Sequence, residues 1–147
     1  MSRFSRPFAL TAVSGLLIAP VSALADDQDV IDYRQHVMKT LGEQAAAIGM
    51  ILEHRAPPEN FAVHVQILAI TAATAKKAFE PKVPGGDAKP DVWAKWADFA
   101  KRLDALAAST ADLAKTAKDG GLAAAEPKVA TALTCKNCHD TYRVPKQ

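Results

Sequence analysis

Cys135-Lys136-Asn137-Cys138-His139 lies close to the C-terminus of the 147-residue chain and contains both of its cysteines. Two thiols one helical turn apart can each add to a haem vinyl group, while the adjacent imidazole reaches the iron from the same side. This C-x-x-C-H spacing is the pattern of covalent c-type haem attachment. It predicts one haem c, bound through thioethers to Cys135 and Cys138, with His139 as the proximal axial ligand of the iron.

A C-x-x-C pair also occurs in thioredoxin-like redox sites and as half of a zinc site. The first needs a βαβ context, and the second needs two further ligands at short spacing. His36, His54 and His64 are scattered over the first half of the chain, and no segment alternates in the strand period. Haem attachment is therefore favoured over the zinc and dithiol alternatives.

The first 25 residues have the pattern of a secretory signal peptide. Arg3 and Arg6 form a basic start, an apolar stretch covers residues 8–21, and small residues precede a cleavage site after Ala25. This predicts a mature haem-binding domain of residues 26–147. The alternative is an uncleaved membrane anchor. However, polar residues interrupt the apolar stretch, and it is shorter than the ~20 residues that a membrane-spanning helix requires. Export agrees with the haem motif and predicts a Gram-negative periplasmic location.

Removal of the leader would take away two arginines and no acids, so that 18 basic residues become 16 against 16 acidic ones. A formally neutral chain argues against nucleic acid or an anionic membrane as partner, because both demand a basic surplus. The remaining length suits one domain.

Helical periodicity and breakers divide the mature chain into four segments, which we expect at residues 29–53, 58–79, 91–119 and 124–144. The stretch 80–90 carries three prolines and two glycines and is expected to be a loop, and Gly120-Gly121 should end the third helix. Four helices with mostly short connections predict an all-α, antiparallel up-down-up-down four-helix bundle that holds the haem between facing helices.

This topology makes the first and last helices antiparallel neighbours. At 1.5 Å per residue, Met38 would lie about 14 Å from the start of its helix and His139 about 8 Å from the end of its own, at the same level of the bundle. Met50 and the other histidines would lie at the far end or on another face. Met38 is therefore the candidate distal ligand, and plain core packing of its side chain is the alternative.

Three stretches resemble one family: Tyr33-Arg34-Gln35, the run from Gly85 to Trp93, and the run from Cys135 to Arg143. Their order and the C-terminal haem motif resemble the class II c-type cytochromes, the cytochrome c-prime group. Members without a sixth protein ligand carry a bulky residue such as leucine three positions after Gln35. This chain has Met38 at that position. In this respect it is similar to the low-spin, methionine-ligated cytochromes of the c-556 type.

The resemblance also implies roles for four neighbours. Arg34 would meet a haem propionate, with a solvated surface arginine as the alternative. Arg143 would lie beside the proximal imidazole, or serve only the helix C-terminus. Phe79 and Trp93 would pack on the macrocycle, or simply belong to the core.

An iron bound by His139 and Met38 has no open position, which predicts a monohaem electron carrier and not an enzyme. Its expected partners are redox proteins, and the resemblance implies a homodimer through the first two helices. The main alternative is a five-coordinate haem protein that binds nitric oxide or carbon monoxide. A haem-free structural bundle is a third interpretation.

Overall fold

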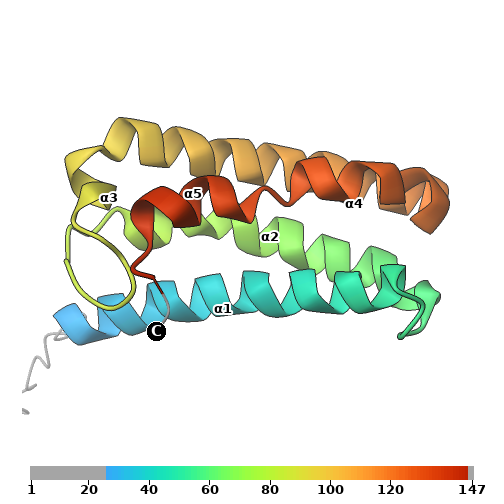
Figure 1. The fold of residues 1–147 in the computed structure, drawn as a ribbon, viewed down its shortest axis with the longest axis horizontal. Coiled ribbons are helices and arrows are strands. Elements are labelled where there is room, and N and C mark those ends of the chain that lie inside the picture. Colours follow the sequence, from blue (N-terminus) through green and yellow to red (C-terminus); the bar gives the residue numbers. More distant parts are fainter. Residues whose placement is uncertain (1–25, 146–147) are drawn as a thin grey trace, which may run out of the picture.

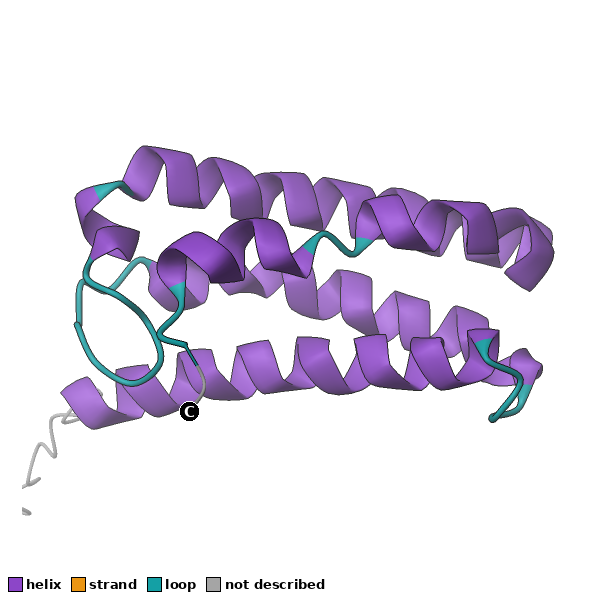
Figure 2. Ribbon diagram, in the orientation of Figure 1, coloured by secondary structure: helices purple, strands orange, loops and turns teal. Residues whose placement is uncertain are grey.

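The computed structural model describes residues 26–145, and the predicted signal peptide lies outside these residues. The described chain is helical (Figure 2). Its elements are α1 (Asp27–Leu52), η1 (Pro58–Asn60), α2 (Phe61–Phe79), α3 (Asp91–Ala94), α4 (Trp96–Ala132) and α5 (Cys135–Tyr142). Within residues 26–145, no helix is sufficiently long and apolar to span a membrane.

The chain reverses direction within α4, at Gly121, whose φ of 70° and ψ of −166° are not helical. Figure 1 shows that the two parts of α4 run side by side in opposite directions, and that α5 continues the returning part. Together with α1 and α2, these helices make the antiparallel up-down-up-down bundle, so the predicted fold class is confirmed.

The first helix begins with a capping box at Asp26. Its carboxylate accepts a hydrogen bond of 2.8 Å from the Asp29 backbone N–H, and the Asp29 carboxylate accepts one of 3.3 Å from the Asp26 N–H. Acidic side chains near a helix N-terminus also favour the helix dipole. The pair of carboxylates at Asp26 and Asp29 therefore fixes where α1 begins.

The prediction of one continuous last helix over residues 124–144 was wrong. The helix is interrupted at Leu133 and Thr134, and α5 ends at Tyr142. Arg143 is extended, with φ −105° and ψ 140°, because the backbone on either side of it pairs with the loop before α3. A tertiary pairing has replaced the last helical turn, which local periodicity cannot reveal.

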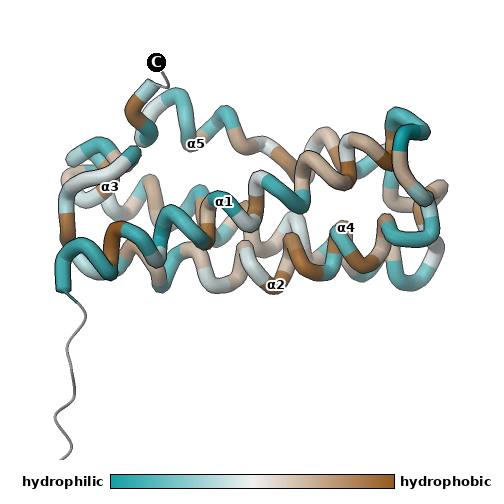
Figure 3. Tube along the Cα trace, turned by 90° about the horizontal axis from the view of Figure 1, so that it is seen from below, coloured by the Kyte–Doolittle hydropathy of each residue, from teal (hydrophilic) through white to brown (hydrophobic). Residues whose placement is uncertain are grey.

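The apolar core lies among α1, α2 and α4, where Ile48, Val65 and Leu113 are fully buried. Buried alanines of α2 and α4 let these helices approach closely. Figure 3 shows that α5 is mainly hydrophilic, whereas apolar segments recur along the other long helices. Apolar packing therefore holds α1, α2 and α4 together, whereas α5 depends mainly on other contacts.

We expect Gly121→Ala to destabilise the bundle by ~1–3 kcal/mol, because a side chain at this φ and ψ strains the backbone. The change isolates backbone strain, since a Cβ at Gly121 would have nothing within 4 Å. Gly49→Ala, in α1 and equally uncrowded, should instead stabilise by ~0.5–1 kcal/mol. Denaturant unfolding of the haem-loaded protein measures both, and equal effects of the two changes would contradict this assignment.

Candidate haem site

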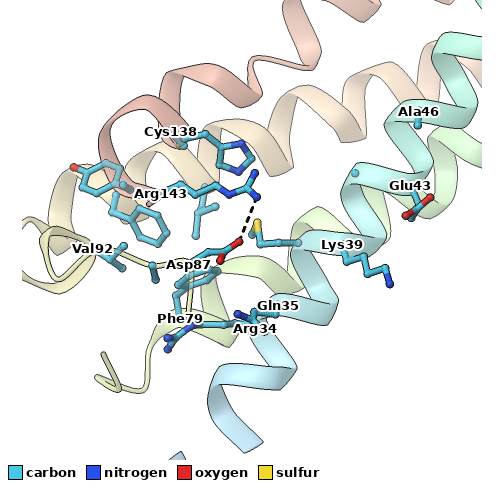
Figure 4. Close-up of a pocket in the computed structure, with 17 residues that line it drawn as sticks. Arg34, Gln35, Lys39, Glu43, Ala46, Phe79, Asp87, Val92, Cys138 and Arg143 are labelled. Carbon is cyan, nitrogen blue, oxygen red and sulfur yellow. Dashed lines mark hydrogen bonds and ion pairs between the residues drawn. The ribbon is translucent and has the colours of Figure 1, made fainter. Parts of the chain in front are cut away.

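A cavity of about 630 Å³ lies between α1 and α5. Its volume falls within the ~300–1,000 Å³ of small-molecule and cofactor sites. The lining residues are Arg34, Gln35, Met38, Lys39, Gly42, Glu43 and Ala46 of α1; Phe79 of α2; Asp87, Ala88 and Val92 around the loop before α3; Phe99 and Leu103 of α4; and Cys138, His139, Tyr142 and Arg143 at the C-terminal end. Figure 4 shows this arrangement, with α1 facing the C-terminal segment across the cavity.

The structure brings both predicted axial ligands to this cavity. Met38 lines it from α1, where its side chain is half-buried, and His139 lines it from α5. Cys138 also lines the cavity, whereas Cys135, one helical turn earlier on α5, is exposed beside it. A soft sulfur and an imidazole on facing helices suit the two sides of a haem iron, and the cysteine pair lies on the imidazole's helix. The donor set thus fits a covalently held haem.

The Arg34 side chain is buried, with 2% of its surface exposed, so the surface alternative was wrong. Its Nη1 and Nη2 atoms donate hydrogen bonds of 2.6 Å to the carbonyl oxygens of Val83 and Gly85. The guanidinium also lies 5.1 Å from the ring centroid of Trp93 and 5.8 Å from that of Phe79. Burial lowers the pKa of Arg34 from its usual value. Contact with a propionate stays a prediction.

Trp93 does not line the cavity, in contrast to its predicted place on the macrocycle. It lies behind Arg34, and its indole Nε1 donates a 3.0 Å hydrogen bond to the Phe79 carbonyl oxygen. Phe79 does line the cavity and meets Phe99 edge-on, with ring centroids 5.1 Å apart. Trp93 therefore closes the base of the loop, and Phe79 forms part of an aromatic wall together with Phe99 and Tyr142.

Arg143 lines the cavity just beyond the end of α5 and donates from Nη2 to the Asp87 carboxylate at 3.2 Å. Figure 4 marks this ion pair, which joins the C-terminal segment to the loop before α3. Both side chains are partly exposed, so the pair itself adds little stability. The pair instead fixes the position of the C-terminal segment. Asp87 belongs to the run from Gly85 to Trp93 that resembles the family, but the sequence did not predict this role for it.

A polar cluster that the sequence analysis missed attaches α5 to α4. The Tyr142 hydroxyl donates a 2.5 Å hydrogen bond to the Asp98 carboxylate, which also accepts one of 2.8 Å from Arg102 Nε. Arg102 Nη1 donates to the Asn137 carbonyl oxygen on α5. The Tyr142 ring is buried and meets Phe99 edge-on at 5.0 Å. These contacts fix the helix that carries His139.

The same cluster shifts several pKa values. The hydrogen bond to Asp98, together with burial, raises the pKa of Tyr142 to about 12. Hydrogen bonds from Tyr142 and Arg102 lower the pKa of Asp98. Burial raises the pKa of the Cys138 thiol.

Two small residues of α1 could have been found from the helical period. Gly42 and Ala46 follow Met38 at intervals of four, so they share its face of the helix. A Cβ at Gly42 would have nothing within 4 Å. The α1 wall is therefore open beyond Met38, which leaves room for a flat cofactor.

The sequence matches the family model described as Cytochrome C' over residues 29–143. It is 28% identical to cytochrome c' of Alcaligenes xylosoxydans, covering 83% of this chain and 98% of the relative. It is 30% identical to cytochrome c-556 of Rhodopseudomonas palustris, covering 89% of this chain and 93% of the relative.

The fold is similar to a solved nitric oxide complex of a mutant of cytochrome c prime from Alcaligenes xylosoxidans. The TM-score is 0.75 at 26% sequence identity, and the match covers 83% of this chain and 99% of the solved one.

The Tyr142–Asp98 hydrogen bond should make stability depend on pH above 10. A raised pKa in the folded state adds stability that is complete below the unfolded value of ~10 and is lost as the pH rises through about 12. Unfolding of the haem-loaded protein between these pH values should therefore become easier in the wild type, and Tyr142→Phe should lack this component. Absorbance of tyrosinate should show that Asp98→Asn lowers the Tyr142 pKa; an unchanged pKa would contradict the assigned cause.

Proposed function

The chain belongs to the cytochrome c' family, whose cofactor is a covalently attached haem c, and on this premise we propose that it is a monohaem electron carrier. In this proposal His139 and Met38 are the two axial ligands of the iron. Haem supplies a one-electron couple, and methionine opposite histidine raises its potential. The resulting transfer needs no open coordination position.

One observation carries the proposal: Met38 and His139 line one cavity from facing helices. Met38 is partly buried and packs against the apolar core, which limits its freedom. A soft thioether presented in this way can hold a haem iron without large rearrangement of α1. The relative named cytochrome c-556 shows that the matching proteins are not all called cytochrome c'.

The other residues of the site position these two ligands. Asp98 and Arg102 hold α5 through Tyr142 and Asn137, and Phe79 provides an aromatic wall. We assign no catalytic residue, and an iron with both axial positions filled does not readily activate oxygen or peroxide. The protein would exchange electrons through the haem edge alone.

A second candidate function is the binding of nitric oxide or carbon monoxide at a five-coordinate haem. The observation that favours it is the solved relative in complex with nitric oxide, at a TM-score of 0.75. The comparisons therefore support gas binding more directly than they support electron transfer, whereas the position of Met38 supports electron transfer. The two functions differ in whether the Met38 sulfur occupies the iron's sixth position.

We further propose that the protein is exported to the periplasm, with residues 1–25 as a cleaved leader and 26–147 as the haem domain. The basic and apolar pattern of the leader supports this, as does the haem motif. Its partners would be redox proteins. A homodimer would use the exposed apolar stripe of α2, where Val63, Ile67 and Ile70 follow the helical period.

Intact-mass spectrometry of the exported protein should give a polypeptide that begins at Asp26 and carries the added mass of one haem, because both thiols lie within one turn on α5. A mature species at the bare polypeptide mass, after coexpression with a haem-attachment system, would contradict covalent binding. Cleavage elsewhere would contradict only the proposed leader.

Met38→Leu tests the choice between the two functions. The change nearly conserves volume and should cost less than about 1.5 kcal/mol in packing, apart from the loss of the iron–sulfur bond. We expect the ferrous spectrum to change from low-spin to high-spin, the far-red band of methionine-ligated ferric haem to vanish, and carbon monoxide to bind readily.

The matched control is Met50→Leu, because Met50 is 40% exposed near the other end of α1 and does not line the cavity. It should leave the spectra unchanged. If the wild-type protein is already high-spin, or if Met38→Leu stays low-spin, Met38 is a core residue and not a ligand. Gas binding then becomes the better proposal.

A further inference from the structure

We propose that the segment 80–90, here called the strap, sets the distance between α1 and α5, and that Arg34 is the positioning residue that holds it. The consequence for the Met38–iron bond rests on the proposed function. The attachment of the strap to both helices rests on the structure alone.

The α1 end of the strap is fixed by Arg34. Its two Nη atoms donate to the carbonyl oxygens of Val83 and Gly85, each at 2.6 Å, so one planar guanidinium holds two strap residues. Charge-assisted hydrogen bonds in such a fork are stronger and more directional than bonds between neutral groups. Because the guanidinium is buried, water has little access to compete for the two carbonyls.

The strap also approaches α1 closely at its two glycines. A Cβ built at Gly85 would lie 2.7 Å from Ile31 Cδ1, and one at Gly86 would lie 2.5 Å from Gln35 Nε2. Both glycines have positive φ, 136° and 56°, which side chains disfavour. The strap is therefore seated directly on the first turns of α1.

The base of the strap is closed where it leaves α2 and enters α3. Trp93 Nε1 donates to the Phe79 carbonyl oxygen at 3.0 Å, which joins the residues on either side of the strap. The Arg34 guanidinium lies over both rings, 5.1 Å from the Trp93 centroid and 5.8 Å from the Phe79 centroid. One arginine thus contacts the strap and both of its supports.

The α5 end is held by antiparallel backbone pairing. The Lys89 N–H donates to the Tyr142 carbonyl oxygen at 2.9 Å, and the Val144 N–H donates to the Asp87 carbonyl oxygen at 2.8 Å. Arg143 adds the ion pair with Asp87 at 3.2 Å. This pairing also explains why α5 stops at Tyr142.

Both attachments lie one helical turn from a proposed ligand. Arg34 precedes Met38 by four residues on α1, and Arg143 follows His139 by four at the end of α5. The strap therefore lies between the start of α1 and the end of α5 (Figure 1), and two of its residues, Asp87 and Ala88, line the cavity. A shift at either attachment would change the separation of the two ligand-bearing turns and would therefore weaken the proposed bond between the Met38 sulfur and the iron.

Three variants of the haem-loaded protein test this. Arg34→Met removes both hydrogen bonds at the α1 end, and Arg34→Lys keeps the charge but not the planar fork. Val144→Pro removes the N–H donor at the α5 end; Arg143 already has the extended conformation that a following proline requires. Arg55→Met is the matched control, because Arg55 is exposed and pairs with Glu53 at the other end of α1.

Hydrogen exchange is the first readout, since it does not depend on the iron's ligands. Arg34→Met and Arg34→Lys should accelerate exchange at the Lys89 and Val144 amides, which Arg34 does not contact, by roughly tenfold. Val144→Pro should accelerate exchange across residues 80–90, and Arg55→Met should change neither region. If exchange were faster only at the residues beside each substitution, the strap proposal would be wrong. It would also be wrong if the amides of Arg34→Lys exchanged at the wild-type rate.

The optical spectrum is the second readout. With a low-spin wild type, all three strap variants should gain a high-spin fraction and bind carbon monoxide faster than Arg55→Met does. An unchanged spectrum in every variant would overturn the effect on Met38 while leaving the electron-carrier proposal intact. A wild type that is high-spin before any substitution would overturn the electron-carrier proposal, and the strap would then be judged by hydrogen exchange alone.

Discussion

The buried guanidinium of Arg34 is the contact on which the haem end of the bundle depends. A charge removed from water costs several kcal/mol unless it is paired or fully hydrogen-bonded. Here two carbonyl oxygens and two aromatic faces surround it. Among residues 26–145 it forms no ion pair, so the backbone of the loop supplies its main polar compensation. The loop, α1 and α3 are consequently held together by one side chain.

The weakly apolar character of α5 explains why such polar contacts matter. A helix of eight residues is too short to be stable by itself and buries only Tyr142 fully. It is held instead by Asp98 and Arg102 on α4 and by backbone pairing with the loop before α3. Covalent haem attachment would add a third constraint on the same helix, so the cofactor and the polar contacts stabilise one another.

Much of this site could be predicted because it follows from spacing. The thiols and imidazole of α5 share one short motif, and the level of Met38 follows from the rise of an α-helix and the order of four antiparallel helices. Arg34, Asp98 and Tyr142 could not be placed in the same way. Their partners lie 44 to 51 residues away along the chain, and no local pattern encodes a long-range pairing. The end of α5 was mispredicted for the same reason.

The α1 wall of the cavity bears on the proposed use of the haem. Along α1, the cavity-lining residues that follow Met38 at intervals of four are small, namely Gly42 and Ala46, although Lys39 and Glu43 also line the cavity. Core packing does not require a glycine at position 42, since a Cβ at Gly42 would meet nothing within 4 Å and glycine weakens a helix interior by ~0.5–1 kcal/mol relative to alanine. Retaining glycine there is consistent with a bulky planar group lying against α1. In the proposed function the side chain at position 38 meets the distal face, and its chemistry would then determine whether the iron transfers electrons or accepts a gas.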